Sequence, residues 1–346
     1  MILAEDILNK LVEKKDLTAA EARAFLDQVI TGDITEAQIG AILTALRMKG
    51  ETPDEIIGLL DAMRAHMLPV SAEGAIDIVG TGGDHAGTFN ISTTAAFVVA
   101  GAGVKVAKHG NRAASSKCGS ADVLEALGVE IELKPPQAEE VFKSVGMVFL
   151  FAPLFHPSMK RVSAVRKELK IRTIFNILGP FANPAGTKRQ IVGVANRDIA
   201  QKMAEVGKHL HFVHLLVVTG FNDAKAIDEI GISGRTHVFE VKGKSVKKYS
   251  INPGTYGFKK TPRQQISGGS PEESAEIIKD ILRGIEKGAR RNVVVLNSAV
   301  ALYVAGVVKD IKQGIKLAEE SIDSGKALQV LENLKRETHR VAPKSQ

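Results

Sequence analysis

Residues 79–93 are Val79-Gly80-Thr81-Gly82-Gly83-Asp84-His85-Ala86-Gly87-Thr88-Phe89-Asn90-Ile91-Ser92-Thr93. They join the apolar run 76–79, which carries one Asp, to small and apolar residues typical of a buried helix. A strand, a glycine-rich loop and a helix start make an anion site, because glycines let main-chain N–H groups approach a phosphate and a helix N-terminus favours negative charge. Lys108 and Arg112 add positive charge. The stretch predicts a site for a ligand with more than one phosphate.

Two common phosphate-binding motifs do not fit this stretch. The dinucleotide motif G-x-G-x-x-G fails because position 85 is His. A P-loop requires Gly-Lys followed by Ser or Thr, which the stretch does not contain. The ligand must therefore be identified from the rest of the chain.

Further motifs follow in order along the chain. They include Gly-Thr-Gly-Gly-Asp at 80–84, Asn-Ile-Ser-Thr at 90–93, Lys-His-Gly-Asn-Arg at 108–112, Val-Arg-Lys at 165–167, Asp-Glu at 228–229 and Leu-Asn at 296–297, with matching stretches at 119–128, 156–160, 171–180, 183–184, 288–291 and 301–305. Over roughly residues 1–335 this series resembles the anthranilate phosphoribosyltransferase family. An ordered series of this length is more specific than any single motif.

The resemblance implies a reaction of tryptophan biosynthesis. The phosphoribosyl group of 5-phosphoribosyl 1-diphosphate passes to the amine of anthranilate, giving N-(5-phosphoribosyl)anthranilate and pyrophosphate. Bond breaking leaves an oxocarbenium-like sugar and builds charge on the departing pyrophosphate, so a protein helps mainly by positioning and electrostatics. No catalytic nucleophile is expected, and the chain shows no obvious Ser-His-Asp or Cys-His set.

By the same resemblance, the phosphoribosyl donor is bound from the glycine loop, the following helix start and residues 108–120. The implied contacts are Gly80, Gly83, Asp84, Thr88, Asn90, Ile91, Ser92, Thr93, Lys108, His109, Gly110, Asn111, Arg112, Ala113, Ala114, Ser115, Ser116 and Ser120. Asp84 could instead bond the amides of its own loop, and Lys108 could be an ordinary solvated lysine. Ser120 is expected at a helix N-cap facing phosphate, and loop 111–116 is expected to close over the donor.

The implied anthranilate contacts are Gly80, Asn111 and Arg166. A guanidinium can recognise a carboxylate through two parallel hydrogen bonds. Nearby sequence offers other cations, and only the Val-Arg-Lys motif selects Arg166 from among Lys160, Arg161, Lys167 and Lys170. His109 either orients the substrate or is structural.

The implied metal ligands are Ser92, Asp228 and Glu229, holding two Mg²⁺ ions per active site, since Mg²⁺ prefers hard oxygen ligands. Without the resemblance, such an acidic pair on a loop after strand 214–218 would be interpreted as solvated. The family commonly has a short His-Gly connection before this pair. Here residues 218–227 are longer and lack His, so the shape of this loop stays open.

Composition narrows the class of protein without choosing a function. With 346 residues, 44% of them hydrophobic, the chain can bury a large core. The apolar run 293–308 is interrupted by Asn297 and Ser298 and is too short to span a membrane. The first residues lack the basic region of a signal peptide and Cys118 is the single cysteine, so a cytoplasmic protein with no membrane partner is expected.

The net charge of +7 raises a nucleic-acid alternative. The basic residues lie in short clusters at 242–248, 259–263, 290–291 and 335–344, with no Trp and only 3 Tyr in the chain. Nucleic-acid grooves interleave basic with aromatic side chains, so these clusters are interpreted as solvated surface and no nucleic-acid partner is expected.

The predicted fold class is α/β, with a small N-terminal helical domain and a larger α/β domain around a mostly parallel sheet. Capping boxes at Thr18, Thr35 and Thr52 begin helices in residues 1–70, and a helical excursion at 158–190 could pack back on them. Residues 71–157 and 191–346 would form the catalytic domain. Expected strands are 76–79, 104–107, 129–133, 148–151, 191–194 and 214–218, with a hairpin at 237–241 and 245–251; expected helices include 120–127, 198–209 and 271–287.

The family also implies a homodimer formed through the helical domain. Two other functions remain as alternatives. One is a pyrimidine nucleoside phosphorylase, or a transferase for another aromatic amine, on the same scaffold, against which Arg166 and the acidic pair count. The other is a non-catalytic nucleic-acid-binding relative, which would not need metal carboxylates.

Overall fold

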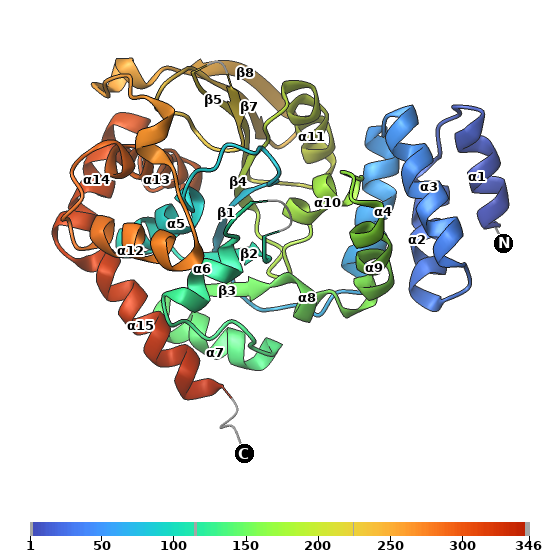
Figure 1. Ribbon diagram of the computed structural model, residues 1–346, viewed down its shortest axis with the longest axis horizontal. Helices are drawn as coiled ribbons and strands as arrows, with labels where there is room; N and C mark the ends of the chain where they lie inside the picture. Colours follow the sequence, from blue (N-terminus) through green and yellow to red (C-terminus); the bar gives the residue numbers. More distant parts are fainter. Residues whose placement is uncertain (1–2, 114–115, 224, 343–346) are drawn as a thin grey trace.

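The computed structural model describes residues 3–113, 116–223 and 225–342. It has a small helical domain beside a larger α/β domain, as Figure 1 shows, which confirms the predicted fold class. Within the three described ranges, no helix combines the length and apolar character needed to cross a membrane.

The N-terminal helices begin where the capping boxes predict. They are α1 (Ala4–Val12), α2 (Ala19–Thr31), α3 (Glu36–Lys49) and α4 (Pro53–Ala65). At the start of α2, Glu21 N donates to Thr18 Oγ1 over 3.2 Å and Thr18 N donates back to Glu21 Oε2 over 2.9 Å. The same reciprocal pair opens α3 and α4, so each helix start has two otherwise free N–H groups satisfied.

The excursion packs back on these helices, as expected. It contains η1 (Pro157–Met159), α9 (Lys160–Leu169) and α10 (Phe175–Phe181), whose apolar residues join the same hydrophobic cluster as α2 to α4. Arg161 Nη1 donates to Val29 O over 3.0 Å, and Arg64 Nη2 donates to Phe181 O over 2.7 Å. These bonds tie together segments that lie more than a hundred residues apart in the sequence.

The described strands form one sheet at the centre of the larger domain. They are β1 (Ile76–Gly80), β2 (Val106–Gly110), β3 (Met147–Phe151), β4 (Arg189–Gly193), β5 (His214–Asn222), β6 (Lys225–Ile227), β7 (Thr236–Lys242) and β8 (Ser245–Ile251). The order is β3-β2-β1-β4-β5-β7-β8, with β6 paired to β5. β1 to β5 run parallel, and β6, β7 and β8 are antiparallel to their partners, so the mostly parallel sheet and its hairpin are confirmed.

Both faces of the sheet are covered. Along β5, Leu216 and Val218 join the cluster of one face, whereas Leu215 and Val217 join the cluster of the other. The first face is covered by α5 (Ile91–Gly101), α7 (Pro135–Val145), α13 (Ala289–Ala305) and α15 (Lys326–Val341), and α12 (Pro271–Leu282) and α14 (Ile311–Asp323) pack on these helices within the same cluster. The second is covered by α11 (Arg197–His209), which lies between the sheet and α4 (Figure 1). The shorter helices are α6 (Ser120–Ala126), α8 (Ala152–Phe155), η2 (Pro253–Tyr256) and η3 (Arg263–Ile266).

Three predicted elements differ from the structure. Residues 129–133 are not a strand: Val129, Ile131 and Leu133 are buried in alternation, but the segment packs toward α15, where Glu130 N donates to Thr338 Oγ1 over 3.2 Å. The strand expected at 104–107 is β2, which runs from residue 106 to 110. The helix expected at 271–287 ends at residue 282, just before Gly284 turns the chain with a φ of 71°.

Candidate active site

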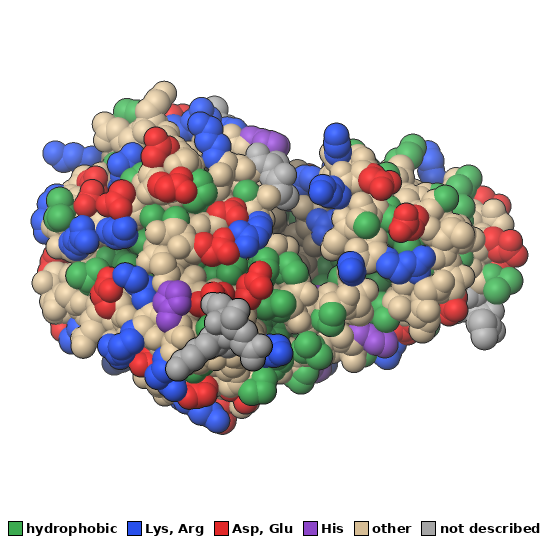
Figure 2. All heavy atoms as spheres, turned by 60° about the horizontal axis from the view of Figure 1, so that its bottom comes forward, with side chains coloured by type: hydrophobic (Ala, Val, Ile, Leu, Met, Phe, Trp, Pro, Cys, Tyr) green, Lys and Arg blue, Asp and Glu red, His purple; other side chains and the backbone are tan. Residues whose placement is uncertain are grey.

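The predicted phosphate loop lies at the carboxyl end of β1, where ligands bind in open parallel sheets. The loop leaves β1 after Gly80, and Gly82, Gly83 and Gly87 adopt φ values of 69°, 69° and 67° that side chains disfavour. It then enters α5 at Ile91, as the sequence predicts. Figure 2 shows a hollow between the large domain and the helical domain on the face it displays.

The segment that carries Asp228 and Glu229 lies against the carboxyl ends of three strands, and each of these strands has a glycine at the contact. A Cβ on Gly80 would overlap the Asp228 carboxylate, and a Cβ on Gly193 would overlap the Asp228 carbonyl oxygen. In β5, a Cβ on Gly220 would overlap the Glu229 carbonyl oxygen. The acidic pair can therefore approach the sheet edge only because these three strand positions have no Cβ atom.

Both acidic side chains bond to main-chain N–H groups of the predicted phosphate site. Gly82 N donates to Asp228 Oδ2 over 2.6 Å. Ser92 N, in the first turn of α5, donates to Glu229 Oε1 over 3.1 Å. The pair thus lies directly beside the glycine loop and the helix start, although more than a hundred residues separate them in sequence.

Like charges gather around this pair. The pKa of Asp228 is raised well above its ordinary value by removal from water and by the charges of Asp84 and Glu229. Removal from water raises the pKa of Glu229 to about 7, while the Lys108 ammonium opposes the rise. Both pKa values are raised because the positive charge near the pair does not balance its negative charge. A cation bound between the two carboxylates would therefore be stabilised.

Lys108 is fully buried rather than solvated, with 2% of its surface exposed. Its Nζ donates to Ile78 O over 2.5 Å and to Ser92 Oγ over 3.3 Å. Burial lowers its pKa, and the charges of Asp77, Glu229 and Asp228 oppose that shift. The alternative that Lys108 is an ordinary solvated lysine is therefore wrong. Its ammonium group lies beside the start of α5, where a phosphate is expected.

The oxygen-rich set of side chains fits Mg²⁺. Asp84 Oδ1 accepts Ala86 N over 2.9 Å, which is the local turn bond that the sequence left open, while Asp84 Oδ2 is buried with no partner among the described residues. Among all the residues that the structure describes, no group of three or more His, Cys, Asp or Glu side chains is arranged to hold a metal ion. Mg²⁺ commonly takes one or two carboxylates and completes its shell with substrate phosphates and water.

The connection before the acidic pair, whose shape the sequence left open, contains a β-hairpin, and the pair itself follows outside any strand. β5 continues to Asn222 and β6 returns at Lys225 to Ile227. Lys225 Nζ donates to the carbonyl of His85 in the glycine loop. From the helical domain, Arg172 Nη1 donates to Gly83 O over 3.3 Å. Two cations that sequence reasoning missed therefore hold carbonyl groups of the phosphate loop.

The described residues between β2 and α6, 111–113 and 116–119, lie outside helices and strands beside the glycine loop. Arg112 donates to both Asp122 and Glu125, so its charge is already paired with carboxylates of α6. Ser120 is not the N-cap: Gly119 occupies that position, and Ser120 Oγ donates to Asn111 O over 3.2 Å. Ala113 N bonds to Asp122, and Ser116 Oγ to Cys118 O. The predicted contacts Ala114 and Ser115 lie outside the described residues.

The remaining donor contacts predicted from the sequence lie on the glycine loop, in the first turn of α5 and at the end of β2. Thr88 forms an isolated bridge with Ser267, and Asn90 is the residue before α5, with Nδ2 donating to Cys118 O over 3.3 Å. Ile91 and Thr93 are buried in the first turn of α5. Gly110 ends β2, where a Cβ would overlap Ser120 Oγ.

A buried polar network lies beneath His109 and was not assigned from the sequence. Asp77, the single Asp in the β1 run, accepts His109 N over 3.4 Å and Asn183 Nδ2 over 2.9 Å. Gln190 Nε2 also donates to Asp77 over 3.1 Å. Burial raises the pKa of Asp77 to about 6. An Asp inside an apolar strand was the available signal for this network.

His109 is held in its neutral form. Its ring centroid lies 5.3 Å from that of His156, and burial together with His156 lowers its pKa to about 3. His156 Nε2 lies 2.9 Å from Ala182 O, and burial lowers its pKa to about 4. His109 Nε2 and His156 Nδ1 have no partner among the described residues, so both uncharged rings keep a free nitrogen.

Arg166 lies in α9 of the helical domain, partly buried. Its guanidinium stacks 5.6 Å from the ring centroid of Phe175, and its Nη2 donates to Asn176 Oδ1 over 3.3 Å. Its Nε has no partner among the described residues, and burial lowers its pKa. By contrast, Arg161 bonds two carbonyls of the helical domain, so Arg166 has the more available donors.

Comparisons with known proteins match nearly the whole chain. A family model described as "Glycosyl transferase family, helical bundle domain" matches residues 5–67, and one described as "Glycosyl transferase family, a/b domain" matches residues 72–328. The anthranilate phosphoribosyltransferase of Methanobrevibacter smithii is 48% identical, over 95% of this chain and 98% of the relative.

Solved structures agree. The crystal structure of anthranilate phosphoribosyltransferase from Thermus thermophilus superposes with a TM-score of 0.89 at 40% identity, covering 96% of this chain and 99% of that one. The enzyme from Saccharomyces cerevisiae in complex with PRPP and Mg has a TM-score of 0.89 at 28% identity, covering 97% of this chain and 98% of that one.

Proposed function

The chain belongs to the anthranilate phosphoribosyltransferase family, and from that membership we propose that it transfers the phosphoribosyl group of 5-phosphoribosyl 1-diphosphate to the amine of anthranilate. The observation that carries the proposal is the convergence of the glycine loop, the α5 start, Lys108 and the acidic pair at one sheet edge. It is the arrangement that a diphosphate leaving group requires.

In the proposed reaction the site residues have three roles: they stabilise the leaving group, hold the metal or bind the acceptor. As the anthranilate nitrogen bonds to the anomeric carbon, the bond from that carbon to the pyrophosphate oxygen breaks and the amine loses a proton. Lys108 and the main-chain N–H groups of the glycine loop would stabilise the departing charge. Bound Mg²⁺ would supply further charge neutralisation on the pyrophosphate.

We assign the metal to Ser92, Asp228 and Glu229, with two ions per active site. The support is the crowding of carboxylates, the buried free oxygen of Asp84 and the Ser92 hydroxyl bonded to Lys108. The number of Mn²⁺ ions bound per chain in the presence of pyrophosphate tests the number of metal sites. Two bound ions per chain support the assignment, and one bound ion per chain reduces it to a single site.

The test of the proposed reaction is product identification. The protein is incubated with Mg²⁺, 5-phosphoribosyl 1-diphosphate and anthranilate, and separately with thymidine and phosphate. Formation of N-(5-phosphoribosyl)anthranilate and pyrophosphate supports the proposal. Thymine release alone would replace it with the nucleoside phosphorylase alternative, and salt-sensitive DNA binding without either product would favour the nucleic-acid alternative.

Arg166→Ala is expected to raise the KM for anthranilate by about 10–100-fold, because a charge-assisted bond to the substrate carboxylate is lost. The KM for 5-phosphoribosyl 1-diphosphate should stay close to that of the wild type. Lys167→Ala, which removes the exposed neighbouring cation, is the matched control and should change neither constant. Equal effects of both substitutions on anthranilate would contradict the assignment.

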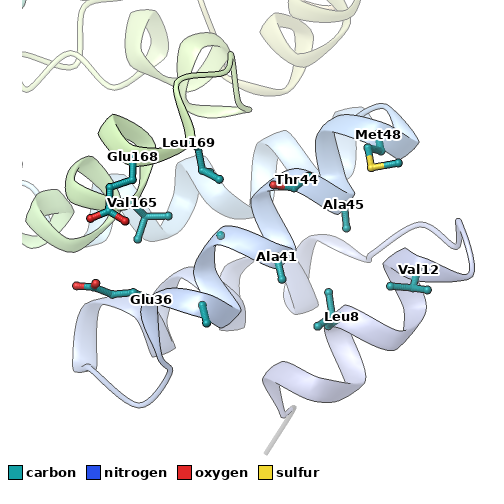
Figure 3. A pocket seen from close by; sticks show the side chains of 12 residues that line it. Leu8, Val12, Glu36, Ala41, Thr44, Ala45, Met48, Val165, Glu168 and Leu169 are labelled. Carbon is teal, nitrogen blue, oxygen red and sulfur yellow. The ribbon is translucent and has the colours of Figure 1, made fainter.

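We also propose that the protein is a homodimer through the helical domain. Helices α1, α3 and α9 frame a groove of about 860 Å³, lined by Leu8, Val12, Ala41, Ala45, Met48 and Val165 among others (Figure 3). Val12 is 70% exposed and Met48 is 83% exposed, although both are apolar. An apolar surface of this kind is better explained by a second copy of the chain than by water.

Met48→Asp is expected to convert the dimer to monomers, because a charge would be buried in the apolar contact. Light scattering after size-exclusion chromatography measures the change in mass. Ile285→Asp places the same charge on another exposed apolar residue, 64% exposed and outside the helical domain, and should leave the mass unchanged. A wild-type protein that is already monomeric would refute the interface.

Two further proposals concern the whole chain. We propose that the domains divide as 1–70 with 158–190, and 71–157 with 191–346; the cluster that joins α9 and α10 to α2–α4 supports this division.

We also propose a cytoplasmic location, for which the support is the single free cysteine Cys118. On the face shown in Figure 2, basic side chains are interspersed with acidic ones, which supports an ordinary solvated surface.

A further inference from the structure

Asn297 is a buried amide in the middle of the apolar helix α13, with 3% of its surface exposed. Its side chain pairs with one residue of another segment. Ile230 N donates to Asn297 Oδ1 over 3.1 Å, and Asn297 Nδ2 donates back to Ile230 O over 3.0 Å. The second hydrogen of Nδ2 goes to Val293 O over 2.8 Å, so both donors and the acceptor oxygen of the amide have partners.

This pairing requires an amide. A peptide group presents a donor and an acceptor, and only Asn or Gln offers the complementary acceptor and donor on one planar group. An Asp would keep the acceptor but oppose the Ile230 carbonyl with a second oxygen. An apolar residue would leave both buried main-chain groups of Ile230 without partners. Asn297 therefore holds the backbone at Ile230 much as a neighbouring strand would.

Ile230 directly follows the acidic pair, in a stretch that has no strand partner. β6 ends at Ile227 and β7 begins at Thr236, so residues 228–235 lie outside the sheet ladder. The backbone here is held by side chains instead. Beside the Asn297 pair, Gly231 N donates to Thr236 Oγ1 over 3.0 Å.

The segment needs such an anchor because its side chains repel one another. Asp228 and Glu229 are adjacent carboxylates, and Asp84 lies close enough to add to their repulsion. Their free ends are bonded to the glycine loop and to α5, which the donor also contacts under the proposed function. A fixed backbone behind the pair keeps both carboxylates aimed at one place when those contacts rearrange.

We propose that Asn297, assisted by Thr236, is a positioning residue that sets the affinity of the Asp228–Glu229 pair for a divalent cation. The inference rests on the proposed function for the identity of the metal ligands. Asn297 itself touches neither metal nor substrate. Residues that orient metal ligands from behind commonly change metal affinity by about 10–100-fold when they are removed.

The test measures Mn²⁺ binding to the full chain by electron paramagnetic resonance, in the presence of pyrophosphate and without turnover. Asn297→Ala is expected to weaken Mn²⁺ binding at least about tenfold and to shift the Mg²⁺ dependence of turnover to higher concentration. The KM for anthranilate should change little. Ser298→Ala is the matched control: Ser298 is equally buried on the same helix and its Oγ has no partner among the described residues.

A folded Asn297→Ala protein with wild-type Mn²⁺ affinity would overturn the inference, as would an equal loss in Ser298→Ala. If Asn297→Ala does not fold, Thr236→Val decides, because it removes only the acceptor for Gly231 N and keeps the volume. It should weaken Mn²⁺ binding in the same direction, and unchanged binding would overturn the inference. A wild-type protein that binds Mn²⁺ but does not consume anthranilate would instead refute the proposed acceptor.

Discussion

Glu229→Gln is expected to reduce turnover by about 10²–10³-fold while the protein remains folded, because a charged ligand for the metal at the leaving group is replaced by a neutral amide. The glutamine Oε1 can still accept Ser92 N, so the local hydrogen bond survives. Turnover measured over a wide range of Mg²⁺ concentrations should show a shifted and lowered curve.

The stability of this variant separates a ligand from a structural residue. Removal from water raises the pKa of Glu229 to about 7, above its ordinary value, so the charged form is disfavoured in the folded state. That destabilisation is absent at low pH and grows as pH rises from the ordinary pKa of a glutamate to the folded pKa. Above neutral pH, Glu229→Gln should therefore melt at the same temperature as the wild type or higher.

Glu276→Gln is the matched control, since Glu276 lies exposed on α12 and pairs only with its neighbour Lys279 among the described residues. It should leave turnover and Mg²⁺ dependence as they are in the wild type. A Glu229→Gln protein with unchanged Mg²⁺ dependence would contradict the role of Glu229 as a metal ligand.

Gly193→Ala is expected to lower kcat/KM by about 10²-fold, because displacing a reacting constellation by about 1 Å has an effect of that size. The added methyl group would overlap the Asp228 carbonyl oxygen, which is backbone and cannot rotate away. The segment 228–229 must shift, and the strain should also reduce the free energy of unfolding by about 1–3 kcal/mol.

The control for this substitution is Gly254→Ala, where the nearest heavy atom to the new Cβ is Asn252 Oδ1 at an ordinary 3.5 Å. Kinetics and denaturant unfolding of both variants give the comparison. Wild-type kcat/KM in a folded Gly193→Ala protein would show that the acidic pair does not depend on the glycine ends of the strands.

The parts of the fold that depend on neighbouring residues could be predicted from the sequence. The capping boxes of α2, α3 and α4 are local hydrogen bonds, and each helix begins where its threonine predicts. The glycine loop and the start of α5 are likewise local. In contrast, residues 129–133 alternate like a strand but pack on α15, because alternation indicates that one face of an extended segment is buried and does not show that a neighbouring strand is hydrogen-bonded to it.

The parts of the site that depend on distant partners could not be predicted. Asp228 and Glu229 were selected only by resemblance, and nothing local indicates that their carboxylates bond to Gly82 and Ser92. The Asn297 pair spans 67 residues. Likewise, Asn222-Asp223 is a turn signal, but a turn signal alone does not show that two paired strands flank it, so the β5–β6 hairpin and the contact of Lys225 with the glycine loop were missed.

The most direct test of the proposed reaction follows the fluorescence of anthranilate after purified protein is mixed with 5-phosphoribosyl 1-diphosphate and Mg²⁺, with a parallel sample containing EDTA. We expect the fluorescence to decay in the first sample and to stay constant in the second, since donor, acceptor and metal are all required. A folded protein that leaves the fluorescence constant in both samples would contradict anthranilate as the acceptor.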